Sequence, residues 1–481
     1  MAVRKKILVV AGNLSHLDQF VIHGFFKELS ESATVYLTLP EEDIATERWA
    51  EVAKILDDSI TEVVPYRYSA RAKTSGYQLG AALTYRYRKA SSGYRGRISN
   101  SLLGNLDIPI RVASVGGIWS LLKNGRPIFK NILHQTPAIL RGSRGFFWIW
   151  SFISVRRIVR ECEILRVLLA VSPDAIITLM QRQAGFVVAS LASGESEGVP
   201  TLLIPYKWDN ASSKSPLIQI PNKMLVYNLG IRETCSKLHK IDIGSVVAVG
   251  SVEVSNRSSV SDLNQDRYVL LIGASANASE SRRWLEVCNN VAQMVSDKPR
   301  DSRIRLFWRP YPTADTKNLE FMKSFVSSHQ NIELDQDIAD VKSHRSGSVS
   351  FGEARLSYFR FIDTLSSASV VVSEGTSAIV DARARGIPVI YPAFKKDSTI
   401  GSQWFHMNHS EHLKGLRETT GVFIAKDEQE LERLLVDFLT NPRRIPADNS
   451  GQSIFVDERS YAQRVLDVVD EAIAEKSAKT G

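Results

Sequence analysis

Short apolar runs alternate with segments of helical periodicity along most of this 481-residue chain, and this alternation limits the possible folds more than any other feature. Runs of four to six apolar residues without polar alternation are typical of strands that are buried on both faces of a sheet. Helical patterns, such as residues 17–30 and 185–197, lie between the runs. The pattern therefore predicts βαβ units and a parallel sheet. In the first half of the chain the expected strands are residues 6–11, 34–39, 175–179, 201–205, 224–227 and 246–250.

A polar, serine-rich stretch at residues 251–266, SVEVSNRSSVSDLNQD, divides the series in two and predicts an interdomain linker. We therefore expect an α/β protein with two doubly wound, Rossmann-like domains, residues 1–250 and 267–455, facing a cleft. Ligands of such sheets bind at the carboxyl ends of the strands, so the cleft is the expected site. The C-terminal segment 456–481 contains an amphipathic helix that we expect to pack back toward the first domain. The strands expected in the second domain are residues 268–272, 303–308, 369–373, 388–391 and 421–424, with helices at 281–295, 379–385 and 428–439.

Residues 66–160 do not fit the alternation, and they carry much of the positive charge. This segment has 17 Lys and Arg residues against one acid, Asp107, in a chain whose net charge is +8. We interpret it as a mainly helical insertion in the first domain with an anionic partner. Within it, GFFWIWSFISV at residues 145–155 is edged by arginines, which suits the headgroup region of an anionic membrane surface. A buried helix with its arginines in water is the alternative, and no nucleic-acid recognition motif accompanies the charge.

Cysteine content and hydropathy indicate a cytoplasmic protein that is peripheral on the inner face of the cytoplasmic membrane. The three cysteines lie far apart without a C-x-x-C pair, which indicates a reducing compartment and argues against a cysteine-built zinc site. The longest apolar stretch has 11 residues, whereas a membrane-spanning helix needs about 20. The opening MAVRKKILVVAGN has too short an apolar run for a signal peptide, and we interpret it as the first strand.

The most informative local pattern is VVVSEGTSAIVDARARGIPVIYP at residues 370–392. A buried strand ends at Ser373, a glycine-containing turn follows, and Thr376 or Ser377 can cap the next helix. Backbone N–H groups at such a helix N-terminus, together with the helix dipole, bind phosphate. Asp381 on the same helix would accept hydrogen bonds from ribose hydroxyls. Helix capping without any ligand is the alternative.

This pattern resembles the donor-site motif in the C-terminal domain of GT-B-fold glycosyltransferases. More narrowly, it is similar to a bacterial surface-polysaccharide and CDP-glycerol glycerophosphotransferase-like subgroup. The resemblance extends over about residues 202–413 and leaves the insertion uncovered, and five motifs in one order are much less probable by chance than one. The four further motifs are IPYKWDNASSKSP (204–216), PNKMLVYNLGIRETCSKLHKI (221–241), LFWRPYP (306–312) and GSQWFHMNHSEHL (401–413).

The resemblance implies a donor site around the turn at residue 375. Gly375, Thr376 and Ser377, with the neighbouring Glu374, would hold the phosphate of a nucleotide-sugar donor. Asp381 would bind the ribose of the same donor. These contacts would let the helix N-terminus take the place that a metal ion has in other transferases.

Further residues of the second domain would complete the donor site. Arg309 would neutralise charge on the leaving phosphate, for which a guanidinium fork is well suited. Tyr311 stands where the subgroup usually has a histidine, which puts in doubt any role of a histidine there. Ser275, together with Asn277 and Ser279, would line the same phosphate pocket, with helix packing or capping as the alternative.

Polar residues after a buried strand of the first domain would face the cleft from the other side. Trp208, Asp209, Asn210 and Lys214 match the tryptophan-aspartate-asparagine motif and its serine-lysine pair, which implies acceptor positioning and donor contact. A buried tryptophan beside a loop Asp-Asn is the purely structural alternative. His406 begins an H-x-x-H-x-x-H run whose members only partly share a helix face. We therefore assign it to donor or acceptor contact and not to a metal.

A catalytic base is expected in the turn after the first strand, GNLSHLDQF at residues 12–20. Glycosyl transfer needs a group that accepts the proton of the attacking hydroxyl. His16 and Asp18 qualify by position. The alternative is that Ser15 caps the first helix and that its neighbours merely lie in the first helical turn.

These patterns predict a metal-independent glycosyltransferase that moves a sugar from a nucleotide-sugar donor to a lipid-linked envelope or capsule glycan acceptor. No cofactor or metal is expected, because the Asp-x-Asp at Asp335 and Asp337 follows a strand only within a polar, acidic loop. A polyol-phosphate transferase of the CDP-glycerol type on the same fold is the first alternative. A non-catalytic nucleotide-sugar-binding partner at the membrane is the second.

Overall fold

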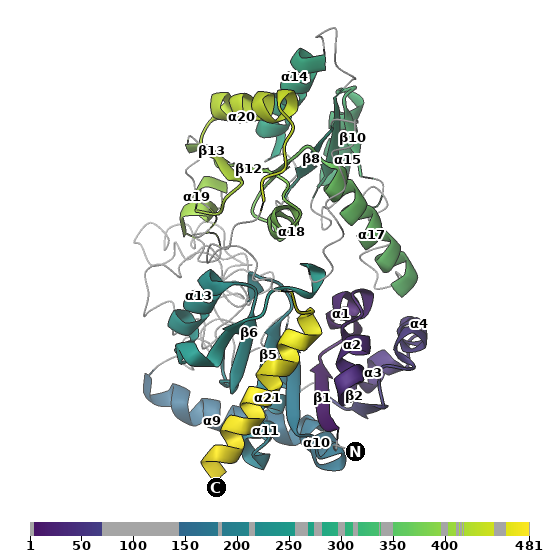
Figure 1. Cartoon of the computed structure of the whole chain (residues 1–481), viewed down its shortest axis with the longest axis vertical. Helices are drawn as coiled ribbons and strands as arrows, with labels where there is room; N and C mark the ends of the chain where they lie inside the picture. The colour runs from purple at the N-terminus through teal and green to yellow at the C-terminus, as the bar shows by residue number, and fades with distance from the viewer. Residues whose placement is uncertain are drawn as a thin grey trace, which may run out of the picture.

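The apolar strands form two parallel sheets, one in each half of the chain (Figure 1). The structure is a computed structural model, and it leaves the side chains of residues 144–150, 316–319, 405, 406, 409, 479 and 480 outside the description. It describes residues 4–69, 144–180, 185–210, 217–254, 268–273, 281–296, 304–310, 316–335, 337, 350–395, 403–409, 413, 416, 418–446 and 458–480.

The sheet of the first domain has seven parallel strands in the order β3-β2-β1-β4-β5-β6-β7. Every residue of β4, β5 and β6 is buried, as expected for strands that helices cover on both faces. The strand order reverses between β1 and β4, which makes the carboxyl ends of these two strands the topological switch point. The strands are β1 Lys5–Ala11, β2 Ala33–Pro40, β3 Glu62–Tyr66, β4 Ala175–Met180, β5 Thr201–Pro205, β6 Lys223–Val226 and β7 Val246–Ala248.

The sheet of the second domain has six parallel strands in the order β10-β9-β8-β11-β12-β13. Its switch point lies between β8 and β11, and β11 is buried along its whole length. The expected pair of doubly wound sheets is therefore confirmed. The strands are β8 Tyr268–Ile272, β9 Arg305–Arg309, β10 Ile332–Leu334, β11 Val370–Ser373, β12 Val389–Pro392 and β13 Val422–Ala425.

Strand β3 was not expected from the sequence. It lies at the edge of the first sheet and pairs only with β2, and most of its side chains are exposed or half-buried. Pro65 lies within it, and proline is tolerated in a strand at a sheet edge because its missing N–H needs no partner there. A short, partly polar strand that contains proline lacks the continuous apolar run by which the other strands were recognised.

Helices cover both faces of each sheet. Helix α17 begins with a capping box, in which Ser350 and Glu353 each accept from the other's backbone N–H. In the first domain the helices are α1 Asp18–Ile22, α2 Phe25–Ser32, α3 Glu41–Ile44, α4 Glu47–Leu56, α9 Arg144–Glu161, α10 Ile164–Val171, α11 Gly185–Glu197 and α13 Leu229–His239, with short turns η1 Leu14–His16, η4 Ile243–Ser245 and η5 Val252–Val254. In the second domain they are α14 Arg282–Ser296, α15 Thr316–Ser327, α17 Phe351–Ser367, α18 Ala378–Ala384, α19 Gln403–His409 and α20 Glu428–Thr440.

The buried apolar residues form three cores, and one of them draws on many residues of both domains. That core includes Leu203 and Trp208 of the first domain together with Val371 and Tyr391 of the second. The two domains therefore contact each other through apolar packing and not only through polar side chains. A second core covers the outer face of the first sheet and includes Phe351 of α17, and the third covers the outer face of the second sheet.

The last helix, α21 Tyr461–Thr480, lies along the first domain, and both termini are at the same end of the molecule (Figure 1). It packs against α2 and β6. Lys223, whose side chain is almost completely buried, donates from Nζ to Glu471 at 2.8 Å and to Glu475 at 2.7 Å. Arg464 donates to the carbonyl of Val249 at 2.7 Å. In the sequence, the second domain is thus inserted between the main part of the first domain and this helix, which packs on the first domain.

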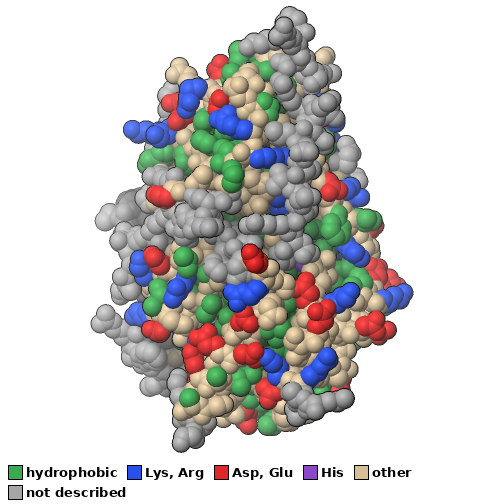
Figure 2. Space-filling model, in the orientation of Figure 1, with side chains coloured by type: hydrophobic (Ala, Val, Ile, Leu, Met, Phe, Trp, Pro, Cys, Tyr) green, Lys and Arg blue, Asp and Glu red, His purple; other side chains and the backbone are tan. Residues whose placement is uncertain are grey.

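Only the flanks of the basic segment 66–160 lie within the described residues, as 66–69 and 144–160. Residues 144–160 belong to helix α9, and residues 70–143 lie outside the described residues. No helix in the described part of the chain is both long and apolar enough to cross a membrane. In the view of Figure 2, Lys and Arg side chains are interspersed with Asp and Glu over the described surface.

Candidate functional site

The two domains meet where strands of both sheets end. Helix α18 follows β11 and contacts η5, which follows β7, while α17 contacts α1 and α4 (Figure 1). Lys207 lies two residues after β5, and its Nζ forms an ion pair with the buried carboxylate of Glu253 in η5. Asp381 is buried in α18 and interacts electrostatically with both of these residues and with Arg385. We call Lys207, Glu253, Asp381 and Arg385 the junction cluster.

Burial shifts the protonation of groups at this junction in opposite directions. Burial, together with the Glu253 carboxylate, raises the pKa of Asp381 to about 7 against the opposing effects of Lys207 and Arg385. It lowers the pKa of His23 to about 4. Burial also acts against the charged form of Lys207, but Glu253 outweighs this and holds the pKa of Lys207 above its usual value. The junction therefore holds a charged lysine, a neutral histidine and a carboxyl group that titrates near neutrality.

Helix α17 connects the two domains directly. Nε2 of His23 and the hydroxyl of Tyr358 lie 3.0 Å apart, and the two rings meet edge to face with centroids 5.1 Å apart. Near the start of α17, the backbone N–H of Gly352 donates to Glu51 at 2.9 Å. Burial raises the pKa of Tyr358 well above its usual value, so its hydroxyl remains protonated. These contacts join α17 of the second domain to α1 and α4 of the first.

The turn after β11 was expected to bind the donor, and its carboxylate faces away from the junction. Glu374 is completely buried and accepts hydrogen bonds from Ser281 at 2.9 Å and from the indole N–H of Trp284 at 3.0 Å. Trp284 lies on α14 and Ser281 directly precedes it, inside the second domain. Glu374 therefore connects the turn to α14, and its predicted role at the donor stays a prediction.

Three residues of the same turn differ in how their backbone N–H groups are used. Gly375 donates to the side-chain oxygen of Gln403 at 3.3 Å, and Thr376 donates to the carbonyl of Glu374 at 2.6 Å. A Cβ at Gly375 would lie 3.3 Å from the Tyr391 hydroxyl, which explains the small residue here. Ser377 is the N-cap residue of α18 but makes no side-chain capping bond. Of the N–H groups at the start of α18, those of Ile379, Val380 and Asp381 donate to the carbonyls of Thr376 and Ser377, which leaves the N–H groups of Ser377 and Ala378 as candidates for an anion.

His16 is buried in the turn after β1, between two aromatic rings. Its ring centroid lies 5.9 Å from that of Phe186 and 6.1 Å from that of Tyr206, and its Nδ1 accepts from the N–H of Gly12 at 3.3 Å. A neutral imidazole that accepts at Nδ1 carries its proton on Nε2. In that tautomer Nε2 would be the donor, and the role of His16 as a catalytic base stays a prediction. The cap of this turn is Asn13, whose side chain accepts from the His16 N–H, and not Ser15 as the structural alternative supposed.

Asp18 begins α1 and forms an ion pair with Arg48 of α4, with Nη2 and Oδ2 2.6 Å apart. Burial raises the pKa of Asp18, although Arg48 acts in the opposite direction. Its other carboxylate oxygen, Oδ1, is buried and has no hydrogen-bond partner. Because a buried unpaired carboxylate oxygen is costly, Oδ1 is suited to accept a hydrogen bond from a hydroxyl group.

The tryptophan-aspartate-asparagine motif follows β5 and is mostly buried. Trp208 belongs to the core that joins the two domains, and Asn210 is buried with its Nδ2 lacking a partner. Asp209 between them is half-buried. Lys214, Ser275 and Tyr311 lie outside the described residues, as does the side chain of His406 on α19. The structure thus brings Lys207 and Trp208 to the junction, and residues 211–216 of the motif lie outside the described residues.

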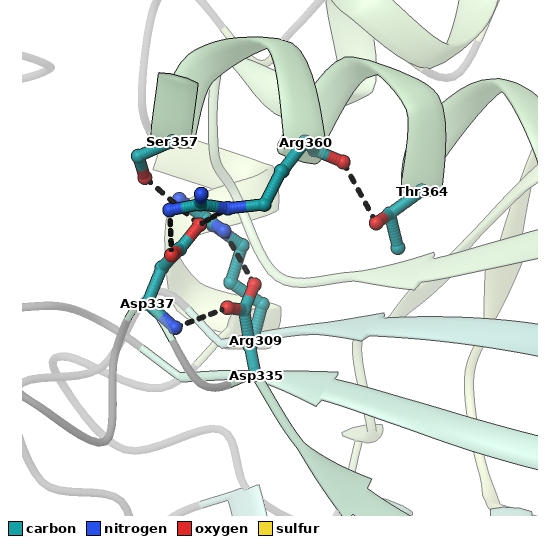
Figure 3. A network of polar contacts seen from close by, with 6 residues as sticks. All are labelled: Arg309, Asp335, Asp337, Ser357, Arg360 and Thr364. Carbon is teal, nitrogen blue, oxygen red and sulfur yellow. Dashed lines mark hydrogen bonds and ion pairs between the residues drawn. The ribbon is translucent and has the colours of Figure 1, made fainter. Parts of the chain in front are cut away.

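Arg309 lies at the end of β9 but points toward β10 and α17 (Figure 3). It forms an ion pair with Asp335 after β10, and its guanidinium lies 4.6 Å from the centroid of the Phe361 ring. Asp337 accepts from Ser357 at 3.0 Å and from Nε of Arg360 at 3.2 Å, and its N–H donates to Asp335 at 2.9 Å. We call Arg309, Asp335, Asp337 and Arg360 the arginine network.

The arginine network changes the interpretation of two sequence predictions. Strand β8 lies between β9 and β11, so Arg309 starts two strands away from the turn at Gly375 and turns to the opposite side. The predicted role of Arg309 at a leaving phosphate stays a prediction, and in the structure its guanidinium is held toward Asp335. Both carboxylates of the Asp-x-Asp sequence are engaged by arginines. Among the described residues, no group of three or more His, Cys, Asp or Glu side chains could hold a metal ion.

Sequence reasoning missed Lys207, Glu253, His23 and Tyr358. Lys207 lies inside the motif at residues 204–216, but the predicted site residues of that motif begin with the next residue, Trp208. Glu253 lies in the stretch that was assigned to the linker, although η5 is buried against the first domain. A usable signal existed for Lys207, because it is a charged residue just after the buried strand β5 of a parallel sheet. Glu253 gave a weaker signal, because it lies five residues after β7, which is only partly buried. No sequence signal pairs His23 with Tyr358, which lie 335 positions apart.

No protein-family model matches the chain, and no curated protein sequence matches it. Solved structures match nearly its whole length. A structure described as a UDP-N-acetylglucosamine 2-epimerase from Listeria monocytogenes has a TM-score of 0.50 and 10% identity, and 98% of each chain is covered. The UDP-GlcNAc 2-epimerase from Methanocaldococcus jannaschii, in complex with UDP-GlcNAc and UDP, has a TM-score of 0.47 and 10% identity over 97% of this chain and 99% of that chain. MurG from Acinetobacter baumannii has a TM-score of 0.41 at 10% identity over the same shares.

At 10% identity, the likeness to the Listeria structure supports the fold alone. That fold is GT-B-like, with two Rossmann-like domains, one for each of the two sheets described above. The sequence prediction of a GT-B arrangement is thereby confirmed. The narrower resemblance to a CDP-glycerol transferase-like subgroup remains a hypothesis that rests on the sequence motifs.

Proposed function

We propose that this chain is a nucleotide-sugar-dependent glycosyltransferase that moves a sugar to a lipid-linked envelope or capsule glycan acceptor. The position of Asp381 carries the proposal. It lies on α18, which follows β11 at the switch point of the second sheet, and next to Lys207 and Glu253 of the first domain. A nucleotide held by the second domain at this place would lie within reach of groups from the first, as transfer between two substrates requires.

The donor would bind at the turn after β11. The N–H groups of Ser377 and Ala378, with the hydroxyls of Thr376 and Ser377, would hold the diphosphate. Asp381, whose carboxylate lies on the same helix, would accept hydrogen bonds from the ribose hydroxyls. Glu374 would act indirectly, by fixing the turn to α14 through Ser281 and Trp284. This arrangement is supported by two observations. The turn is fixed to α14 of its own domain by hydrogen bonds, and the helix α18 that follows it contacts η5 of the first domain.

The acceptor would bind against the first domain, with Asp18 as the proton acceptor. Its Oδ1 has no hydrogen-bond partner, and burial raises its pKa toward the range that suits a general base. The Nε2–H of His16 would donate a hydrogen bond to the reacting centre or to the acceptor. Trp208 and the unpartnered amide nitrogen of Asn210 would position the acceptor from the end of β5. Asp18→Asn should therefore abolish transfer while nucleotide binding persists.

Transfer would proceed without a metal ion at the reacting centre. In support, the Asp335 and Asp337 carboxylates, which form the Asp-x-Asp sequence, are each bound by an arginine. A divalent cation would have to displace both arginines to use them. Turnover should persist in EDTA, and activity that EDTA abolishes and manganese restores would refute this part of the proposal.

The first domain would sit on the anionic inner face of the cytoplasmic membrane through α9. Phe152 and Ile153 are 56% and 51% exposed, beside the exposed Arg156, Arg157 and Arg160. The Arg156 guanidinium lies 4.1 Å from the centroid of the Phe152 ring. Exposed apolar side chains next to arginines are typical of helices that lie in a membrane interface. The side chains of Trp148 and Trp150, which belong to the expected aromatic patch, lie outside the described residues.

Vesicle co-sedimentation tests the membrane contact. Phe152→Ser with Ile153→Ser should weaken binding to phosphatidylglycerol vesicles at high salt, where the electrostatic part is screened. Ile243→Ser is a matched control, because Ile243 is 45% exposed on the same domain but lies outside α9. Equal binding by the double variant and the wild type, or no binding by the wild type at low salt, would exclude α9 as the contact.

A thermal-shift panel of UDP, CMP, CDP, GDP and their sugars tests the main proposal. Stabilisation by a nucleotide sugar, followed by transfer to a lipid-linked acceptor, is the expected result. A preference for CDP-glycerol would favour the polyol-phosphate transferase, which the sequence motifs alone suggest. Tight binding of a nucleotide sugar without turnover of any donor would favour the non-catalytic binding partner. No stabilisation by any nucleotide would contradict all three functions.

A further inference from the structure

Helix α17 belongs to the second domain by sequence, but its first turn is built into the first domain. Phe351 is almost completely buried, and among the described residues it is the single member from the second domain in the core that covers the outer face of the first sheet. The backbone N–H of the next residue, Gly352, donates to the carboxylate of Glu51 on α4 at 2.9 Å. The start of α17 is therefore packed and hydrogen-bonded as part of the first domain.

The rest of α17 is fixed to the second domain. Ser357 donates to Asp337 at 3.0 Å, and the Tyr268 hydroxyl of β8 donates to the carbonyl of Thr364 (Figure 3). Leu365, near the end of the helix, is completely buried in the core that draws on both domains. Helices are stiff elements, so a helix held by one domain at its start and by the other along its length fixes the position of each relative to the other.

The two helices that α17 contacts in the first domain, α1 and α4, are those that hold Asp18. Asp18 begins α1, and its carboxylate pairs with Arg48 of α4 at 2.6 Å. His23 ends α1, and its Nε2 lies 3.0 Å from the hydroxyl of Tyr358 on α17. Helix α1 has five residues, and a helix this short is not stable by itself. Its place in the molecule therefore depends on contacts such as the one with Tyr358.

We propose that Phe351 and Tyr358 of α17 are positioning residues for the proton-accepting carboxylate of Asp18, so that the donor-binding domain holds the reactive group of the acceptor-binding domain in place. This inference rests on the proposed function, in which Asp18 accepts the proton. Phe351 and the N–H of Gly352 hold α4, which carries the partner of Asp18, and Tyr358 holds the end of α1. A general base acts only within hydrogen-bond reach of the hydroxyl, and a displacement of about 1 Å can lower the rate about 100-fold.

The consequence is a loss of turnover without a loss of donor binding. Tyr358→Phe keeps the ring that meets His23 edge to face but removes the hydroxyl. In this variant kcat should fall several-fold, while the donor KM and the affinity for the nucleotide stay within about twofold of the wild type. Phe351→Ala should lower kcat further, by about tenfold or more. Phe351→Leu should retain most of the wild-type kcat, because leucine refills most of the apolar volume.

Leu356→Ala is the matched control, because Leu356 is 58% exposed on the same helix. It should leave kcat and the donor KM unchanged. Amide hydrogen exchange of the nucleotide-free, full-length protein provides a readout that does not need turnover. Phe351→Ala should raise exchange in α1 and α4 but not in the turn after β11, and Leu356→Ala should raise it in neither place.

Separate results contradict the two proposals. If the wild type turns over no nucleotide sugar, the proposed function fails, while the exchange data decide separately whether α17 holds α1 and α4 in place. If the wild type is active but Tyr358→Phe and Phe351→Ala leave kcat unchanged, or raise the donor KM instead, the positioning role is overturned. Unchanged exchange in α1 and α4 of Phe351→Ala overturns it as well. Tyr358→Phe removes a single oxygen atom, so it provides the test even if Phe351→Ala does not fold.

Discussion

The junction cluster and the arginine network contain the same charges but behave in opposite ways. Each has two acidic and two basic side chains, and each lies at the carboxyl ends of parallel strands. In the arginine network both acids have an arginine as a direct partner, and Arg360 is 60% exposed. In the junction cluster only Glu253 is directly paired, and both acids are buried.

The pKa values of the acids show what this difference means. Burial acts to raise the pKa of Asp337, but hydrogen bonds from Arg360 and Ser357 outweigh it and lower the pKa below its usual value. At Asp381 burial prevails, and the pKa rises to about 7. Direct hydrogen bonds from a cation thus decide whether the pKa of such an acid lies below its usual value or rises toward neutrality. Only the second kind can respond to a ligand or to pH near neutrality.

The largest expected effect concerns the stability of Asp381→Asn. A carboxyl group whose folded-state pKa is raised from 3.8 to about 7 favours the folded state below pH 3.8 and loses that contribution as the pH rises to 7. Between pH 5 and pH 8 the free energy of unfolding of the wild type should therefore fall by roughly 3 kcal/mol relative to that of the asparagine variant. Urea titration of both proteins at the two pH values measures this. A difference between the proteins that does not change with pH would show that Asp381 is already ionised at pH 5.

His23 should produce a smaller effect with the opposite sign. Its pKa is lowered from 6.5 to about 4, so its contribution to stability is present above pH 6.5 and is lost as the pH falls to 4. His23→Gln should therefore remove an acid sensitivity of roughly 2 kcal/mol between pH 8 and pH 5. In the wild type this term and that of Asp381 partly cancel, so each variant should depend on pH more steeply than the wild type. Glutamine retains a donor for Tyr358, which limits the loss of the interdomain contact.

The fold could be predicted from the sequence because burial on both faces leaves a strong pattern. Strands such as Ala175–Met180 and Val370–Ser373 are apolar runs that are buried along their whole length. The edge strand β3 was missed because a half-exposed strand with proline has no such pattern. The site was predicted less completely. The turn at Gly375 was located by the chemistry of helix N-termini, but the direction of each side chain depends on tertiary contacts.

Glu374 and Glu253 show why the hydrogen-bond partners of side chains could not be predicted from the sequence. Glu374 lies in the middle of the recognised turn, yet its carboxylate is bound by Trp284, a residue 90 positions away. Glu253 lies in a stretch of linker-like composition, yet it becomes the partner of Lys207, 46 positions away. In both cases the deciding interaction is between distant segments and leaves no trace in local composition. Hydrogen-bond partners of acids therefore required the structure, whereas their positions at strand ends did not.

Within the arginine network, Asp335→Asn should destabilise the protein by about 1.5 kcal/mol, because it removes a charge-assisted hydrogen bond from the mostly buried Arg309. Urea titration of both proteins at pH 7 measures this loss. No loss would mean that the direct pairing of Asp335 contributes nothing to stability, and it would remove the contrast between the two clusters.

The smallest effect is expected at Glu333, which lies on β10, two residues before Asp335. Glu333 accepts two hydrogen bonds from Arg305 at 2.8 Å, but the two side chains are 45% and 52% exposed. Exposed ion pairs contribute little, because water and salt already screen both charges. Glu333→Gln should therefore cost about 0.5 kcal/mol in low salt and less in 0.5 M sodium chloride, as measured by urea titration. Arg305 and Glu333 form two parallel hydrogen bonds, so their direct pairing is good although they are exposed. A loss of stability as large as that of Asp335→Asn would therefore show that direct pairing, and not burial, determines how much these acids contribute to stability.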